Sequence, residues 1–307
     1  MHKSAKMDEP SDSTSMSHDQ KEKGSLEKAT NEKLNVYIWD MDETIILLKS
    51  LLNGTYAMAF NGSKDVQKGI EIGKRWETRI LQACDEFFFY EQIENYNEPF
   101  LDSLREYDDV RDLSDYDFSK DDYGPPYDDP NKRKLAYRHR MIGQKYEQGL
   151  HDVLDHEMIK VWDDLYELTD AYTDRWLSSE SDAVSTDVKC QNLNVLVTSG
   201  SLIPTLVKCL LFRLDDLITH GNIYSSWEVG KLRCFSWIKE RFGGPGVQFC
   251  VIGDGPEECE AAQFMKWPFI RINLRPNGTH RFPGLTTEAI NRRISAFYGI
   301  DANNGDS

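Results

Sequence analysis

Apolar and polar positions alternate in blocks that predict strands and helices following one another from about residue 34 onward. Residues 36–39, Val-Tyr-Ile-Trp, form an uncharged run of β-branched and aromatic side chains, which is typical of a strand buried in a parallel sheet. Similar runs lie at 193–197, 223–224, 247–252 and 268–273. Apolar residues at helical spacing follow most of them, at about 203–212, 230–242 and 286–297. This succession predicts an α/β fold built on a parallel sheet.

The region between the first two predicted strands is instead helical, with apolar periodicity at about 64–87, 132–150 and 152–177. We predict that the acidic segment 108–129 is a solvated loop anchored by its aromatic residues, and a cation site is the alternative. The basic side of 132–150 is expected to face solvent, and a docking face for an acidic or phosphorylated partner is the alternative. A polar linker is predicted at 178–187, and we expect structural roles for His139, His151 and His156.

These segments predict a discontinuous catalytic core, residues 34–61 and 186–301, interrupted by a helical cap insertion at 62–185. Residues 1–33 contain almost no large apolar side chain, so we expect a disordered N-terminal tail. Residues 302–307 are expected to form a short C-terminal tail.

The net charge of −16 argues against direct binding of nucleic acid or anionic membranes, which both reward clustered Lys and Arg. No apolar run approaches the roughly 20 residues needed to span a bilayer, and the N-terminus lacks the apolar core of a secretory signal. The six cysteines show no Cys-x-x-Cys spacing. We expect them to be reduced residues of an intracellular protein.

The first predicted strand ends in Asp40-Met41-Asp42-Glu43-Thr44. Ligands of open α/β sheets bind beyond the carboxyl ends of the strands, so two carboxylates stand where chemistry usually occurs. Like charges this close favour a compensating cation, and Mg²⁺ prefers such oxygen ligands. The alternative is an acidic turn in which Asp42 or Thr44 caps a helix.

Three later features occupy corresponding places at strand ends or a helix start. Along the chain, the Asp40/Asp42 pair is followed by two hydroxyls, a lysine and a second acidic cluster. Together these four features supply what phosphoryl transfer through a covalent intermediate requires. These requirements are a carboxylate nucleophile, an acid/base, an oxygen-ligated metal, and groups that bind phosphate. Lysine at a helix start opposes the helix dipole, which suggests another role for it. The residues are Thr198 and Ser199, Lys231, and Asp254 with Glu257 and Glu258.

This set resembles the four motifs of the haloacid dehalogenase superfamily, which has a Rossmann-like core. Within it, the chain closely resembles the Eyes absent family of metal-dependent protein tyrosine phosphatases, from about residue 34 to the C-terminus. The resemblance is carried by 39–46 (WDMDETII), 50–57 (SLLNGTYA), 112–118 (DLSDYDF), 134–140 (KLAYRHR), 194–198 (NVLVT), 202–204 (LIP) and 251–258 (VIGDGPEE). Two departures are the absence of the long N-terminal transactivation region of animal members and Thr198-Ser199-Gly200 in place of three threonines.

The resemblance implies Mg²⁺ held by Asp40, Asp254 and the backbone carbonyl of Asp42. It implies that Asp40 attacks phosphorus and that Asp42 serves as general acid and base. Lys231 and either Thr198 or Ser199 would bind phosphoryl oxygens. Supporting roles are expected for Thr44 and for Glu257 and Glu258, which would order the metal's waters or Lys231.

The expected substrate is a phosphotyrosyl protein. We expect the helical cap to cover the site and to determine substrate selectivity. A small-molecule phosphomonoesterase is the first alternative. A binding partner of nuclear transcription regulators, docking through the helical cap, is the second. The expected location is the nucleus, the cytoplasm or both.

Overall fold

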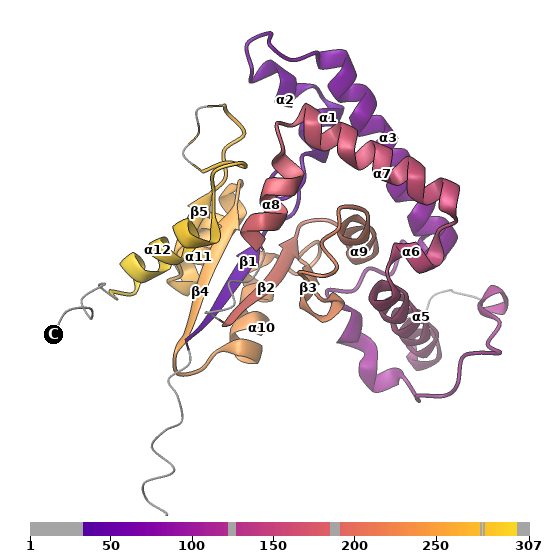
Figure 1. The fold of residues 1–307 in the computed structure, drawn as a ribbon. Coiled ribbons are helices and arrows are strands. Elements are labelled where there is room, and N and C mark those ends of the chain that lie inside the picture. The colour runs from indigo at the N-terminus through magenta and orange to yellow at the C-terminus, as the bar shows by residue number, and fades with distance from the viewer. Residues whose placement is uncertain (1–32, 122–126, 185–190, 277, 279, 300–307) are drawn as a thin grey trace, which may run out of the picture. The chain divides into compact units, whose positions relative to one another are not determined.

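The computed structural model describes residues 33–121, 127–184, 191–276, 278 and 280–299. Within them, one parallel sheet has the strand order β3-β2-β1-β4-β5, and β1 lies in its middle (Figure 1). Parallel pairing places all five carboxyl ends at one edge, which confirms the predicted α/β fold with a parallel sheet. The strands are β1 (Leu34–Trp39), β2 (Gln191–Thr198), β3 (Ile223–Ser225), β4 (Val247–Gly253) and β5 (Phe269–Arg271).

Helices cover both faces of the sheet, because successive side chains of a strand point to opposite faces. Val36 and Ile38 of β1 belong to a cluster that includes residues of α10 and α11. Tyr37 and Trp39 belong to the other cluster, with residues of α9 and α12. Both faces of β1 are therefore buried, as its uncharged sequence predicts. These helices are α9 (Leu202–Leu211), α10 (Lys231–Phe242), α11 (Pro256–Met265) and α12 (Thr287–Phe297).

The chain between β1 and β2 is helical, as predicted, but its third segment is not one helix. Asp155 begins a new helix by accepting a hydrogen bond from the Met158 amide at 2.8 Å. A second break follows where Asp174 and Arg175 take positive φ angles. The elements are α1 (Leu48–Leu52), α2 (Thr55–Met58), α3 (Val66–Phe87), α4 (Tyr90–Ile93), the 3₁₀ segments η1 (Leu101–Tyr107) and η2 (Phe118–Lys120), α5 (Asp129–Gln148), α6 (Leu150–Val153), α7 (His156–Tyr172) and α8 (Trp176–Val184).

The linker predicted at 178–187 is also wrong in its first part, since residues 178–184 belong to α8. Its remainder lies outside the described residues, as do both predicted tails apart from Lys33. No helix of the described ranges is both long and apolar enough to cross a membrane.

Apolar contacts join the inserted helices to the sheet layer. Trp76 of α3 stacks on Phe212, just after α9, with ring centroids 4.2 Å apart. Its indole N–H donates to Thr169 Oγ1 of α7 at 2.7 Å. One apolar cluster thus runs from α7 through α3 to α9, and the domain boundaries at 62 and 185 stay a prediction.

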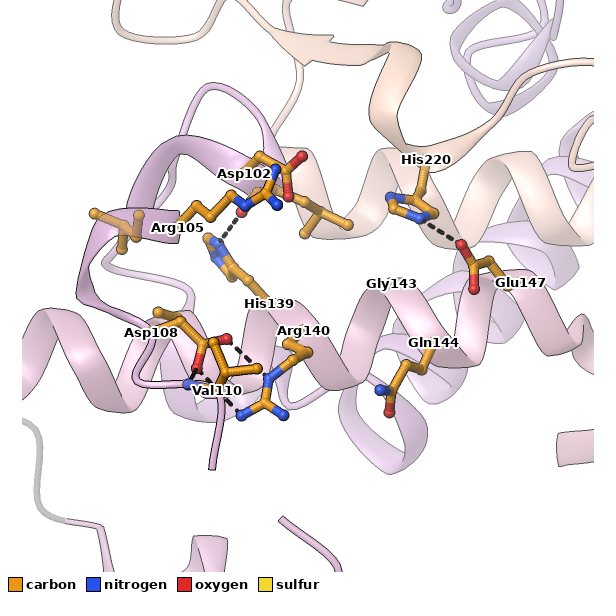
Figure 2. Close-up of a pocket in the computed structure, with 13 residues that line it drawn as sticks. Asp102, Arg105, Asp108, Val110, His139, Arg140, Gly143, Gln144, Glu147 and His220 are labelled. Atoms are coloured by element: carbon orange, nitrogen blue, oxygen red, sulfur yellow. Dashed lines mark hydrogen bonds and ion pairs between the residues drawn. The ribbon is translucent and has the colours of Figure 1, made fainter. Parts of the chain in front are cut away.

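A hollow of about 450 Å³ lies between α5 and η1 (Figure 2). Buried His139 donates from Nδ1 to the Leu101 carbonyl at 3.1 Å. Burial lowers the pKa of His139 to about 4, so its ring is neutral at pH 7. Of the carboxylates that line the hollow, Asp108 pairs with Arg140 and Glu147 with His220, and the charge of Asp102 only partly offsets the effect of burial on His139. His139 therefore serves the packing of α5 on η1.

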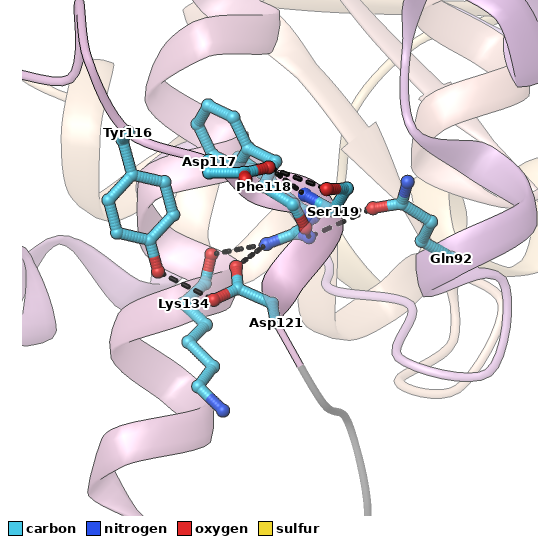
Figure 3. Close-up of polar contacts among 8 residues, drawn as sticks. Gln92, Tyr116, Asp117, Phe118, Ser119, Asp121 and Lys134 are labelled. Atoms are coloured by element: carbon cyan, nitrogen blue, oxygen red, sulfur yellow. Dashed lines mark hydrogen bonds and ion pairs between the residues drawn. The ribbon is translucent and has the colours of Figure 1, made fainter.

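The expectation that the basic side of α5 faces solvent is wrong at Arg138, which is fully buried. Its guanidinium pairs with Asp121 and donates to Gln92 Oε1 at 2.8 Å and to the Phe118 carbonyl at 2.9 Å (Figure 3). Arg140 also forms an ion pair with the acidic segment, from its Nε to Asp108 Oδ2 at 2.8 Å. Two residues of the acidic segment thus pair with the basic helix, and docking of an acidic partner on the remaining basic residues stays a prediction.

Candidate active site

A tight turn after β1 fixes Asp40 at the carboxyl edge of the sheet. The Asp40 amide donates to the Ile252 carbonyl of β4 at 2.9 Å, which continues the strand pairing by one residue. Glu43 then takes a φ of 64°, and its amide donates to the Ile46 carbonyl at 2.7 Å. This reversal brings the Thr44 hydroxyl to Asp40 Oδ2, to which it donates at 3.2 Å. Thr44 therefore orients the Asp40 carboxylate.

The alternative role of these residues as helix caps is not found. The next helix begins only at Leu48, and its N-cap residue, Leu47, makes no side-chain hydrogen bond. Asp42 and Thr44 are thus available for a role at the sheet edge.

Lys231, at the first position of α10, reaches across the sheet edge between two carboxylates. Its ammonium contacts Asp40 Oδ1 and Glu258 Oε1, and all three residues are buried. Burial lowers the pKa of Lys231, but the two carboxylates more than offset this and raise it overall. Burial likewise raises the pKa of Glu258, and the Lys231 charge reverses the shift so that the pKa falls. The unfavourable position at the helix start is thus compensated by anions.

Gly253, the last residue of β4, permits this close approach. A Cβ at this position would lie 2.9 Å from Glu258 Cγ and 3.3 Å from Asp40 Cβ. The glycine therefore allows the ends of β1 and β4 and the first turn of α11 to bring their carboxylates together.

Two carboxylates contact the Lys231 ammonium and the charge of a third, Asp254, acts on them, which leaves a surplus of negative charge. Burial raises the pKa of Asp40 to about 7, and the charges of Glu258 and Asp254 add to this while Lys231 opposes it. The pKa of half-buried Asp254 is also raised, first by burial and then by Glu258. Glu258 Oε2 is buried and finds no donor within the described part of the chain. Surplus charge and an unmatched acceptor fit a divalent cation with oxygen ligands.

No three His, Cys, Asp or Glu side chains gather as a ready metal site in the ranges that the structure describes. Asp40 and Asp254 could supply two carboxylates and Asp42 its backbone carbonyl, with water completing the shell, as Mg²⁺ sites commonly do.

Lys208 of α9 is a site residue that sequence reasoning missed. Its ammonium donates to Asp42 Oδ1 and Oδ2 at 2.8 and 3.0 Å. Lys208 is the single charged residue of α9, LIPTLVKCLL. A lone charge in an otherwise apolar helix is the sequence feature that could have indicated a role for it.

The two hydroxyls after β2 lie in different surroundings. Thr198 is buried, and its Oγ1 accepts a hydrogen bond from the Gly200 amide at 3.1 Å. Ser199 is exposed and lines a hollow that also contains Lys231. A Cβ at Gly200 would lie 3.5 Å from Thr198 Oγ1 and 4.0 Å from Asp42 Oδ2. The glycine thus leaves a small space beside Asp42.

The structure therefore brings most predicted site residues to one edge of the sheet. Asp40, Lys231 and Glu258 are in contact, Thr44 supports Asp40, and Asp254 is close enough for its charge to act on Asp40. Glu257 is exposed and lines the hollow beside Lys231, without contacting it.

Comparison with known proteins gives a consistent set of relatives. The chain is 58% identical over 280 residues to Protein phosphatase EYA of Arabidopsis thaliana, which covers 87% of this chain and 91% of that protein. It is 35% identical over 260 residues to human Protein phosphatase EYA2, covering 79% of this chain and 48% of EYA2. It is 34% identical over 258 residues to Drosophila melanogaster Protein phosphatase eya, covering 78% of this chain and 33% of that protein. The chain thus spans half or less of these animal relatives, and no family model matches it.

Proposed function

This chain belongs to the Eyes absent family of protein phosphatases, and we propose that it hydrolyses phosphotyrosine in proteins through an aspartyl-phosphate on Asp40. The observation that carries the proposal is the contact of Lys231 with both Asp40 and Glu258 at the carboxyl edge of the sheet. Phosphoryl transfer requires this combination of a carboxylate nucleophile and a fixed cation.

In the first step, Asp40 attacks phosphorus and the bond to the phenolic oxygen breaks. Thr44 holds Asp40 Oδ2, and Lys231 holds Oδ1. These contacts orient the nucleophile, and the Lys231 ammonium stabilises the negative charge that develops on the phosphoryl oxygens.

Asp42 donates a proton to the leaving oxygen and then takes one from the water that hydrolyses the aspartyl-phosphate. The assignment of Asp42 as the acid follows the resemblance to the family; its side chain is only partly buried, and Lys208 contacts both its oxygens. Ser199 is the better candidate for the phosphate hydroxyl, because Thr198 is buried and its hydroxyl contacts its own turn.

Asp40, Asp254 and the backbone carbonyl of Asp42 would hold Mg²⁺, which would neutralise negative charge on the phosphoryl group. The surplus of carboxylates there supports such a cation. Glu258 keeps Lys231 in place beside the nucleophile.

A substrate panel tests this proposal. Phosphotyrosyl peptides, phosphoseryl peptides and sugar phosphates are assayed with Mg²⁺, with EDTA, and with EDTA followed by excess Mg²⁺. We expect turnover of phosphotyrosyl peptides that EDTA abolishes and Mg²⁺ restores. Full activity in EDTA would exclude the metal-dependent mechanism, and faster turnover of sugar phosphates would favour a small-molecule phosphomonoesterase.

A further inference from the structure

An open groove lies directly beside Lys231, between the loop after β3, the first turn of α10 and one side of α11. It has a volume of about 740 Å³ and is lined by residues 226–232, 257, 260, 261 and 264 together with Ser199. We call it the α10/α11 groove. Its floor is held in place, because Ser226 donates to the Thr198 carbonyl through both its amide, at 2.8 Å, and its hydroxyl, at 2.9 Å.

Large apolar side chains in this groove are exposed. Trp227 is 65% exposed and Phe264 74%, and Val229 and Leu232 are exposed beside them. Apolar side chains gathered in one hollow, rather than scattered, mark surfaces that bind a partner. Tryptophan and phenylalanine also provide large contact areas at little cost in conformational entropy.

The charge of the groove is negative. Glu228, Glu257 and Glu260 line it, are exposed, and form no ion pair with another described residue. Lys231 is the sole cation among the lining residues, all of which are described, and Asp40 and Glu258 neutralise it. A positively charged partner therefore complements this surface.

We propose that the α10/α11 groove binds the polypeptide next to the phosphotyrosine and selects substrates with a large apolar residue flanked by Lys or Arg. This inference rests on the proposed function. The groove shares Ser199 and Lys231 with the candidate active site, so a chain whose phosphate lies at Asp40 continues into it. The apolar side chain packs on Trp227 and Phe264, and the basic residues meet Glu228 and Glu260.

The test uses phosphotyrosyl peptides of equal length, with Leu and two Arg residues placed before or after the phosphotyrosine. Matched peptides carry Glu in place of Arg, or Ala in place of Leu. For the better of the two placements, we expect the peptide with Leu and two Arg residues to have a kcat/KM about tenfold above that of each matched peptide. The Ala peptide loses one buried apolar side chain, and the Glu peptide loses two exposed ion pairs.

Variants of the groove then identify the contacts. The double variant Glu228→Lys/Glu260→Lys should reverse the preference for Arg over Glu, and Trp227→Ala should remove the preference for Leu over Ala. The readout is the ratio of kcat/KM for peptide to that for p-nitrophenyl phosphate, and melting temperatures report folding. Glu240→Lys, at the far end of α10, and Leu81→Ala, an exposed residue of α3, are the matched controls.

Hydrolysis of all phosphotyrosyl peptides with equal kcat/KM, or groove variants that behave like their controls, would overturn this inference alone. Absence of hydrolysis of every phosphotyrosyl peptide, with p-nitrophenyl phosphate still hydrolysed, would overturn the proposed function and the inference with it.

Discussion

Lys208 donates to both oxygens of the Asp42 carboxylate, and the lysine is largely buried while Asp42 remains partly open. A cation held by an apolar helix thus fixes the side chain that we assign as general acid and base. The contact sets the direction from which Asp42 reaches a leaving oxygen, and its geometry matters because small displacements of catalytic groups are costly.

The variant Lys208→Met keeps an unbranched apolar stem and removes the terminal ammonium and its charge. We expect kcat on a phosphotyrosyl peptide to fall roughly 10–100-fold through misplacement of Asp42, with a smaller change in KM. Lys208→Arg should recover part of kcat, whereas exposed Lys239→Met should change nothing. Activity of Lys208→Met within twofold of wild type would show that the contact has no role in turnover.

Asp40→Asn and Asp42→Asn separate the nucleophile from the acid. Asp40→Asn should abolish turnover of every substrate. Asp42→Asn should lose roughly 10²–10⁴-fold on an alkyl phosphate, less on phosphotyrosine and least on p-nitrophenyl phosphate, whose leaving group needs little protonation. Rapid-quench measurement of the first-step burst gives this order. Equal losses on all leaving groups would refute the assignment of Asp42.

Gly200→Ala tests the small space beside Asp42. The added methyl group makes only ordinary contacts with Thr198 and Asp42, so the melting temperature should change little. If phosphate occupies this space, kcat/KM should fall roughly 10–100-fold through displaced substrate. Gly244→Ala, an exposed position with a similarly unhindered Cβ, is the control. Unchanged kinetics would place the phosphate elsewhere.

His139 makes the protein sensitive to acid. Its pKa is about 4 in the folded protein and near 6.5 when unfolded, so the unfolded state binds the proton more tightly. Its stabilising contribution is therefore present above pH 6.5 and is lost as the pH falls toward 4, by up to roughly 3 kcal/mol. His139→Asn retains an N–H for the Leu101 carbonyl and should flatten this part of the curve. Exposed His156→Asn should not, and urea unfolding at several pH values measures the difference.

Arg138 and Asp121 form a buried pair whose loss is predicted to be costly. Arg138→Met leaves Asp121 buried without its cation and should lower the free energy of unfolding by about 3–5 kcal/mol. The double variant Arg138→Met/Asp121→Leu should recover much of that loss, because no unpaired charge remains. Denaturant unfolding compares the two, and a double variant no more stable than the single one would contradict this account.

Local patterns were sufficient for the strands and for the residues at their ends. The uncharged run before Asp40 and the acidic turn after it are both encoded within ten residues. The pairing of Arg138 with Asp121, however, joins two segments that each look solvated when considered alone. The helix break at Asp155 is marked by an N-cap residue, but the apolar periodicity continues across it and predicts a single helix.

Lys208 shows a different limit of prediction. A lysine within an apolar helix is commonly explained by a stem that packs while its ammonium reaches water. Its partner, Asp42, lies in another part of the sequence, and only the fold brings them together.

The position of β1 in the middle of the sheet has a consequence for synthesis of the chain. Leu34 pairs with Gln191 on one side and with Val247 on the other, so both neighbours of the first strand are made long after it. At common translation rates, β4 follows β1 by about 10–40 s. Until β2 is made, an apolar segment of high β-propensity has neither neighbouring strand available, which favours pairing with other chains. Formation of the sheet around β1 must therefore wait until more than half of the chain has been made.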